Sequence, residues 1–458
     1  MHTPSGNSHQ GTVPSTPQEV VRHGLERMTS AGPLFRGTVI VLGALFALGI
    51  VGFIIRASQG FDDRLPWGYY AAVFGYFLTT AQSAPMVAIA LRAVKAGWRR
   101  PVARVAEMWT VVGVLNLLWF LPIMALVPTI EGRRSLWVTR PIGAPHAWDL
   151  LVVLFLAVCG LGLLYTSALP DLAAVREKGS GFRQRFARTL SSFWRGTRLQ
   201  WNVLYGGIAL LGTFYAMLLV FGHALLSTDV AMSMVPGWKD AIFPAFHALS
   251  GLQSAVAVVI VTLFVLRTWG GYKEQIHVDQ FWGLSKLLLA FSLLWFYFWF
   301  SGFITFWYGR APTEQVLLRY LYFESYRLPF LMAFFLNFVA PIFLVLLWNP
   351  FRKSILGPTL AAAFILVGTL FDRIRIYVAA FSAGDPFADA LEHVPAAHLP
   401  GVPDILIVVG GLAGAVLMYM LAVRLIPVMA WWELKEGLLL RRVRPFLRRH
   451  MTVVAKPD

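Results

Sequence analysis

A small set of ionisable residues lies in or beside long apolar stretches, and these residues are the first candidates for chemistry: Asp149, His223, Asp229, Asp372 and Arg373. A charge inside the hydrocarbon of a bilayer is costly, so such a residue usually faces the interior of a helix bundle and marks a functional site. A histidine and carboxylates beside a cavity can hydrogen-bond carbonyl or hydroxyl groups and accept protons. The set therefore predicts a chamber for a ligand with a polar head near one side of a membrane.

The stretches that must position these residues are each long enough to cross a bilayer, because about 20 apolar residues span it as a helix. They cover residues 34–55, 69–91, 105–128, 147–169, 200–226, 241–266, 284–308, 328–348, 355–381 and 404–427. The chain is 57% hydrophobic and only 14% charged, whereas soluble domains carry about 25% charged residues. We predict an all-α polytopic membrane protein with ten transmembrane helices over 34–427, an N-terminal arm over 1–33 and a basic C-terminal tail over 428–458.

The distribution of positive charge predicts the topology. Of the 39 Lys and Arg residues, 25 fall in the two termini and the even-numbered connections, and nine fall in the odd-numbered connections. Positive residues favour the cytoplasm, so both termini are predicted to be cytoplasmic. The net charge of +16 is explained by this topology and by contact with anionic lipid, and we predict no nucleic-acid partner.

With this topology the candidate residues approach the outer face. Asp149 begins the fourth span, His223 lies in the last turns of the fifth, and Asp229 follows it. Asp372, Arg373 and Arg375 lie in the outer half of the ninth span. Gln82 lies deeper, about 20 Å from the start of the second span at 1.5 Å per residue. Pro85 and Pro122 are predicted to kink the second and third spans.

Each candidate also has a purely structural interpretation. An ion pair between Asp372 and either Arg373 or Arg375 is an equal explanation, because pairing reduces the cost of burying charges in the membrane. His223 is also explained as a packed histidine with satisfied hydrogen bonds, Asp149 as a helix cap at the interface, and Asp229 as a turn residue.

Electron carriers of its own are not expected in this chain. The single cysteine, Cys159, lies in an apolar run, and the sequence contains no CxxC, CxxCH or glycine-rich phosphate loop. His223 and His247 occur on consecutive spans, but not at the spacing of a haem-binding pair within one span. We predict no metal site, and no haem or iron–sulfur cluster bound by this chain alone.

Several segments resemble one family of membrane proteins. They are LPWGYYAAVFGYFLTTAQSAP, RRPVARVAEMWT, HAWDLLVVLFLAVCGLGLLYTSALPDLA, FGHALLSTDVAMSMVPGWKDAIFPAF, LLWFYFWFSGFITFWYG and LFDRIRIYVAAF. In this order over about residues 60–440, the chain is similar to the NrfD/PsrC family of quinone-interacting membrane subunits. It most resembles the ActC-type subunit of alternative complex III.

The resemblance implies two four-helix bundles, over about 69–226 and 241–381, with the first and last spans flanking them. It implies a quinol site near the periplasmic face, with quinone or menaquinone as substrate and Asp149 and His223 as the catalytic pair. Trp67, Gln82, Asp149, His223 and Asp229 would bind the quinone, and Asp372, Arg373 and Arg375 would form a proton path or a structural ion pair.

The same resemblance implies partners and a location. Electrons would pass to a periplasmic iron–sulfur subunit of the molybdopterin-protein type, beside other membrane subunits and a c-type cytochrome, in the respiratory chain of a bacterial inner membrane. The family commonly has a histidine in a sequence such as AHAGT, where this chain has AQSAP with Gln82. Glutamine cannot act as a base near neutral pH, so a quinone-reducing anchor, a proton- or ion-translocating subunit and a purely structural subunit remain alternatives.

Overall fold

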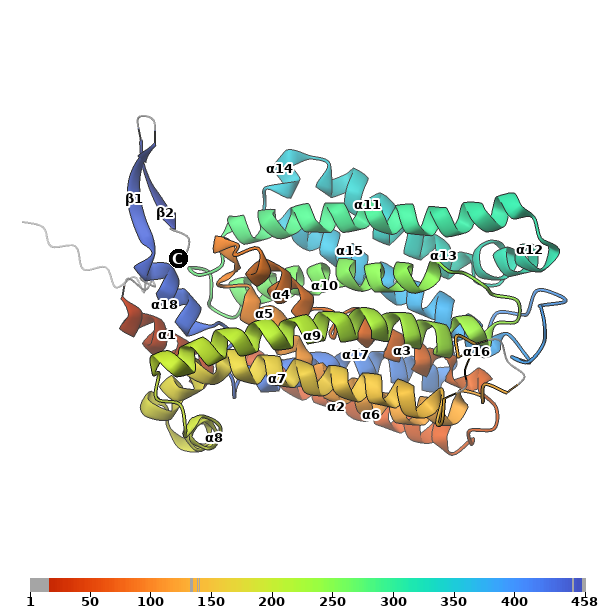
Figure 1. The fold of residues 1–458 in the computed structure, drawn as a ribbon, viewed down its shortest axis with the longest axis horizontal. Helices are drawn as coiled ribbons and strands as arrows, with labels where there is room; N and C mark the ends of the chain where they lie inside the picture. The colour runs from red at the N-terminus through yellow and green to blue at the C-terminus, as the bar shows by residue number, and fades with distance from the viewer. Residues whose placement is uncertain (1–15, 132–134, 138, 140, 447–448, 455–458) are drawn as a thin grey trace, which may run out of the picture.

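The computed structural model describes residues 16–131, 135–137, 139, 141–446 and 449–454. Its helices run side by side along the long axis of the molecule (Figure 1). Eight helices of the described residues are long and apolar enough to cross a membrane. They are α2 (Pro33–Ala57), α5–η3–α6 (Ala103–Glu107, Met108–Val111, Val112–Leu126), α7 (His146–Lys178), α9 (Arg198–Val230, extended by η4, Met232–Met234), α10 (Phe243–Thr268), α11 (Val278–Gly309), α13–η6 (Arg327–Phe334, Phe335–Leu346) and α17 (Val402–Ala422).

The predicted second span, 69–91, is interrupted. It forms α3 (Gly68–Thr79) and α4 (Pro85–Ala93), with a turn over 80–84 between them. Pro85 has no N–H to continue the hydrogen bonds of α3, and its ring clashes with the preceding turn. The kink predicted at this proline is therefore a complete break.

The predicted ninth span, 355–381, is also divided. It forms α15 (Leu356–Arg373), the π-helical turn η7 (Ile374–Val378) and α16 (Ala379–Ser382). The segment η6 is π-helical as well. π-Helical turns inside longer helices occur frequently at functional sites. Asp372 and Arg373 occupy the last two positions of α15, directly before η7.

Shorter elements cap the two ends of the molecule. They are α1 (Pro17–Thr29), η1 (Leu65–Trp67), η2 (Gly97–Arg99), α8 (Gly181–Ser191), α12 (Pro312–Leu318), η5 (Arg319–Phe323), α14 (Asn349–Arg352), α18 (Trp431–Leu439) and the antiparallel hairpin β1 (Arg441–Phe446) and β2 (Arg449–Val454). One end carries α1, α8 and α18, and the other carries α12 and α16 (Figure 1). We call these the α18 end and the α16 end.

The N-terminal arm predicted over 1–33 is helical where the structure describes it. Val20, Val21 and Met28 of α1 are buried against residues of α7, α8 and α18, including Trp431. A capping box between Thr16 and Glu19 begins α1, and this satisfies backbone donors at its start. Residues 1–15 of the predicted arm lie outside the described residues. The described parts of the two terminal segments therefore pack together at the α18 end.

Helix packing explains how the candidate residues approach one another. α9 packs against α7 and α10, and α10 packs in turn against α11, α15 and α3. α2 packs along α17, where Gly49 faces Gly410 so closely that a Cβ on Gly410 would lie 2.3 Å from the Gly49 Cα. Small residues that let helix backbones approach are typical of helix pairs in membranes. The long helix α10 therefore lies between α9 on one side and α11 and α15 on the other, while α3 also packs directly against α15 and η7.

Candidate functional site

The break between α3 and α4 forms the centre of the candidate site. Nearby side chains bond to two carbonyl groups of this break. Ser83 Oγ donates to the Leu78 carbonyl oxygen at 2.8 Å, and the Tyr215 hydroxyl donates to the Gln82 carbonyl oxygen at 2.5 Å. Gln82 and Ser83 are both buried. Irregular backbone at membrane depth is tolerated where protein surrounds it or where it lines a cavity.

A chain of hydrogen bonds leads from this break across three helices. Ser83 Oγ lies 3.1 Å from His223 Nε2, His223 Nδ1 lies 2.8 Å from His247 Nδ1, and His247 Nε2 lies 3.1 Å from the Tyr377 hydroxyl. These residues come from the turn after α3, from α9, from α10 and from η7. All four side chains are buried. We call this set the histidine chain.

One assignment of hydrogens gives every donor in the histidine chain an acceptor. Because Ser83 donates to the Leu78 carbonyl, its oxygen can accept from His223 Nε2–H. His223 Nδ1 then accepts from His247 Nδ1–H, and His247 Nε2 accepts from the Tyr377 hydroxyl. Both imidazoles are neutral in this arrangement. The chain can carry a proton by reversal of its hydrogen bonds.

Three charged residues adjoin the histidine chain at the end of α15. Asp372 accepts from Arg373 Nη2 at 2.5 Å and from Arg375 Nη2 at 2.7 Å. Arg373 Nη2 also donates to Ser250 Oγ at 3.2 Å, one helical turn beyond His247 on α10. The three charged side chains are buried, and Arg373 Nε and Nη1 have no hydrogen-bond partner among the described residues. Two arginines share one carboxylate here, so the cluster carries an excess positive charge.

A pair of amides lies on the other side of the helix break. Asn116 Nδ2 donates to Gln82 Oε1 at 2.5 Å, and both side chains are buried. Gln82 Nε2 and Asn116 Oδ1 have no hydrogen-bond partner in the described part of the chain. If both amides were rotated by 180°, one donor and one acceptor would still be unused. The pair can therefore bind a carbonyl or a hydroxyl group that enters between α3 and α6.

The remaining predicted residues lie around this centre. Asp149 is buried in the first turn of α7. Gly222 of α9 faces Val152 of α7, where a Cβ on the glycine would lie 3.0 Å from the valine side chain. Because α7 and α9 are antiparallel, this register places Asp149 within about one to two helical turns of His223. Asp229, at the end of α9, accepts from Trp137 Nε1 at 2.6 Å.

Trp67 is buried beneath the α16 end. Its Nε1 donates to the Gly60 carbonyl at 3.2 Å, and its ring stacks on Phe61 with 4.7 Å between ring centroids. These contacts give the ring a structural role in closing the connection before α3. The structure thus places His223 in the histidine chain, with Gln82 next to Ser83 in sequence. Asp372, Arg373 and Arg375 form a separate ion cluster, which reaches α10 through Ser250. Asp149 lies nearby, while Trp67 contacts Gly60 and Phe61 and Asp229 contacts Trp137, all in connecting segments.

A second polar interior lies between α10, α11, η6 and α15. Gln253 Nε2 donates to Ser292 Oγ and to the Asn337 carbonyl oxygen, both at 2.9 Å. Ser254 Oγ lies 2.8 Å from Thr369 Oγ1. All five side chains are buried. Gln253 Oε1 and Asn337 Nδ2 have no hydrogen-bond partner among the residues described, so this interior has unused polar atoms.

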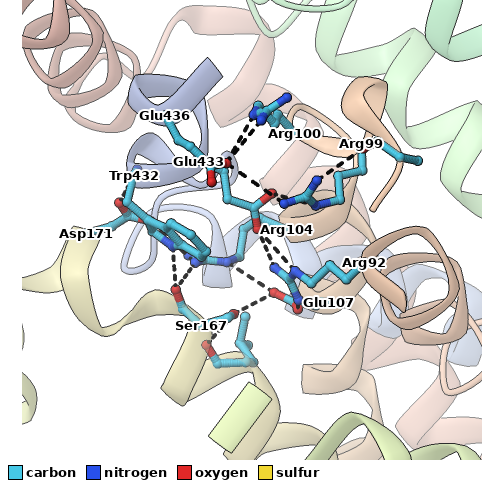
Figure 2. Close-up of polar contacts among 12 residues, drawn as sticks. Arg92, Arg99, Arg100, Arg104, Glu107, Ser167, Asp171, Trp432, Glu433 and Glu436 are labelled. Atoms are coloured by element: carbon cyan, nitrogen blue, oxygen red, sulfur yellow. Dashed lines mark hydrogen bonds and ion pairs between the residues drawn. The ribbon is translucent and has the colours of Figure 1, made fainter. Parts of the chain in front are cut away.

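A network of buried ions ties the α18 end together (Figure 2). Arg92 of α4 contacts both Glu107 of α5 and Glu433 of α18, the latter at 2.7 Å. Arg104 lies 3.3 Å from Glu107 and 3.3 Å from Asp171 of α7. Ion pairs this deeply buried hold elements in register, and removing one partner leaves an uncompensated charge.

The same network fixes the start of α18. The backbone N–H of Trp432 donates to Asp171 at 3.1 Å, and Arg100 donates to Glu436 at 3.2 Å (Figure 2). α18 was not expected from the sequence, which predicts a basic tail after residue 428. Its acidic residues Glu433 and Glu436 are the signal that this segment docks onto the arginines between α4 and α5.

Of the residues that complete the site, Tyr377, Asn116 and His247 were not assigned a binding or catalytic role from the sequence, and Ser83 was named only as a neighbour of the predicted kink at Pro85. Ser83, Tyr377 and Asn116 carry no motif, and His247 was considered only as one of a possible haem pair. Their signal is weak because serine, tyrosine and asparagine occur in many apolar spans as ordinary packing residues. The position of Ser83 two residues before Pro85, where a helix must release backbone groups, is the one local clue.

Two comparisons with known proteins gave no relative. No protein-family model matches the chain, and no curated protein sequence matches it significantly. Among the described residues, no group of three or more His, Cys, Asp or Glu side chains is placed to hold a metal ion. The helix break and the histidine chain are the features of this structure that bear most directly on function.

Proposed function

We propose that this chain is a quinone-binding membrane subunit of a multisubunit oxidoreductase, of the kind found in alternative complex III. The observation that carries the proposal is the helix break between α3 and α4. On one side it presents an amide pair with an unused donor and an unused acceptor, and on the other it begins a chain of two histidines. A quinol needs both a polar anchor for its ring oxygens and a route for its protons.

The amide pair supplies the anchor. A quinone carbonyl accepts from an amide N–H, and a quinol hydroxyl also donates to an amide carbonyl, so Gln82 and Asn116 suit both redox states. Gly113 lies against this pair: a Cβ there would make ordinary contact with Gln82 Nε2 at 3.4 Å and Ala157 Cα at 3.6 Å, so a larger side chain would press on the amides. Glutamine in place of the family histidine thus acts as a binding residue rather than as a base.

The histidine chain supplies the proton route. Oxidation of a quinol releases two electrons and two protons. The electrons pass to an iron–sulfur centre in a partner subunit, and the protons pass to Ser83, His223, His247 and Tyr377 in turn. Asp149 lies within one to two turns of His223 and is the second acceptor. The reverse direction, quinone reduction, uses the same groups.

We further propose that the two interrupted segments cross the membrane with the eight uninterrupted helices. This gives ten spans, with α3–α9 as one four-helix bundle, α10–α15 as the other, and α2 and α17 flanking them. The α18 end, with its excess of Lys and Arg, would then face the cytoplasm of a bacterial inner membrane. The α16 end would face the periplasmic partner subunit and a c-type cytochrome.

The test measures quinone binding by the full chain in lipid nanodiscs, with menaquinone and ubiquinone analogues followed by quenching of tryptophan fluorescence. Gln82→Leu and Asn116→Leu are expected to weaken binding about tenfold, which corresponds to the loss of one buried hydrogen bond. The matched control, Gln253→Leu, removes a buried glutamine on the far side of α10 and should leave quinone binding unchanged. Equal binding by Gln82→Leu, Asn116→Leu and the unmodified chain would exclude this site.

A second candidate function, proton translocation without redox chemistry, is favoured by one observation. The polar interior formed by Gln253, Ser254, Ser292, Asn337 and Thr369 extends from the Asp372 cluster toward the middle of the α10–α15 helices. Such residues inside a helix bundle can hold a chain of water molecules. Proton flux into liposomes that contain the chain alone, followed with a pH-sensitive dye, separates this function from quinone binding.

A further inference from the structure

A cavity at the α18 end lies apart from the helix break. Its volume is about 400 Å³, and it opens between α1, the segment before α5, the connection from α10 to α11, and α18. This volume falls within the range of small-molecule sites, about 300–1,000 Å³. Trp98, Tyr272 and Trp431 contribute aromatic walls, and Glu274, Gln275 and Asp279 contribute polar atoms.

Two hydrogen-bond acceptors in this cavity have no donor. Glu274 Oε2 and Gln275 Oε1 are buried and have no hydrogen-bond partner among the described residues. A buried acceptor without a partner costs about 1–3 kcal/mol, and more when it is charged. These two residues line the cavity, so a ligand with N–H or O–H donors is favoured there.

The charges in the cavity wall favour a cation. Glu274 has no ion pair in the described part of the chain, and Asp279 adds a second carboxylate. The one arginine in the wall, Arg100, is already bonded to Glu436 at 3.2 Å. Burial and the neighbouring Arg27 lower the pKa of His23, against the opposing effect of Glu274, and this disfavours a cationic His23 beside Glu274.

The aromatic walls favour an organic ammonium over a metal ion. Indole and phenol rings attract ammonium groups through their π faces, whereas Ca²⁺ and Mg²⁺ require several oxygen ligands in a shell. A primary ammonium has three N–H donors, which suits the free oxygens of Glu274 and Gln275. The position of the cavity also favours a lipid head group. The connection from α10 to α11 joins the ends of two membrane-length helices, which is where lipid head groups are found.

We propose that this cavity binds the primary ammonium of an aminophospholipid head group, with Glu274 and Gln275 as acceptors and Trp98, Tyr272 and Trp431 as the aromatic wall. The bound lipid would bridge α1 and α18 and hold the two terminal segments against the helix ends. This inference does not depend on the quinone site. The same chemistry could also capture a free amine, so the experiment separates the two sources.

The experiment uses the full chain in nanodiscs of phosphatidylethanolamine, phosphatidylcholine or phosphatidylglycerol, with lipid retention read by native mass spectrometry and stability by thermal melting. Phosphatidylethanolamine is expected to be retained and to raise the melting temperature, and Glu274→Gln should reduce its retention at least tenfold. Glu177→Gln, which alters an exposed carboxylate at the same end of the molecule, should retain the lipid as the unmodified chain does. Gln275→Leu removes the second acceptor without a change of charge and should reduce retention about threefold.

Each outcome decides the proposal. Equal retention of phosphatidylethanolamine by Glu274→Gln and Glu177→Gln would overturn it, as would equal stabilisation by phosphatidylglycerol. Stabilisation by free ethanolamine in phosphatidylglycerol nanodiscs, at the level reached with phosphatidylethanolamine, would keep the ammonium site but overturn the lipid as its source. If Glu274→Gln does not fold, unchanged retention by Gln275→Leu would overturn the proposal and weakened retention would support it.

Discussion

His223 Nδ1 lies 2.8 Å from His247 Nδ1, and this contact joins α9 to α10 in the interior of the molecule. Only one of the two nitrogens can carry a hydrogen in the neutral pair, so the contact has a direction. Ser83 and Tyr377 bond the outer nitrogens at 3.1 Å each. Two imidazoles in such a chain can exchange a proton without movement of either helix.

Replacement of His247 by phenylalanine should therefore interrupt proton transfer while keeping a ring in the same space. We expect about a 100-fold loss of quinol-dependent electron transfer in the complex purified with its partners, within the usual range for loss of an acid–base group. Tyr377→Phe, which removes only the terminal hydroxyl, should cost less. His393→Gln, at an exposed position in a connecting segment, should have no effect, and a comparable loss in this control would contradict the assignment.

The two candidate functions predict different effects for Gln253→Leu. If the polar interior between α10 and α15 conducts protons, this substitution should reduce proton flux in liposomes severalfold, because it removes a side chain bonded to Ser292 and Asn337. Quinone binding should not change. A variant with normal proton flux and weakened quinone binding would show that the roles of the two interiors had been reversed.

Two ion pairs of nearly equal length should differ in their contribution to stability. Arg56 lies 2.6 Å from Asp404, with 11% and 0% of the two side chains exposed, and Arg319 lies 2.7 Å from Glu324, with 58% and 44% exposed. Removal of one partner from a buried pair costs about 3–5 kcal/mol, whereas an exposed pair contributes about 0–1 kcal/mol. We expect Arg56→Met to lower the thermal stability of the purified chain strongly and Arg319→Met to leave it almost unchanged.

The close approach of α2 and α17 predicts a sharp difference between two glycines. A Cβ on Gly410 of α17 would lie 2.3 Å from the Gly49 Cα, while a Cβ on Gly43 of α2 would meet no atom within 4 Å. Gly410→Ala should therefore separate the two helices and destabilise the chain by about 1–3 kcal/mol. Gly43→Ala should be neutral or slightly stabilising, since alanine favours helices. Equal melting temperatures for the two variants would contradict this packing.

The sequence by itself determined that the chain is a helical membrane protein, because composition and the length of apolar stretches depend only on local residue content. It also located the break at Pro85, because the missing N–H of proline acts within one helical turn. The positions of His223, Asp372 and Arg373 near one end of their helices follow from counting residues along each span.

Only the tertiary structure decided which of these residues meet. The contact between His223 and His247 depends on how α9 rotates against α10, and hydrophobic spans without a strong amphipathic pattern do not specify that rotation. The docking of α18 on the buried arginines was likewise invisible, since ion pairs between residues about 340 positions apart leave no local pattern. Side chains such as Asn116 and Gln253 became candidates for function only in the folded structure. There they are buried, and the Asn116 Oδ1 and Gln253 Oε1 atoms have no hydrogen-bond partner among the described residues.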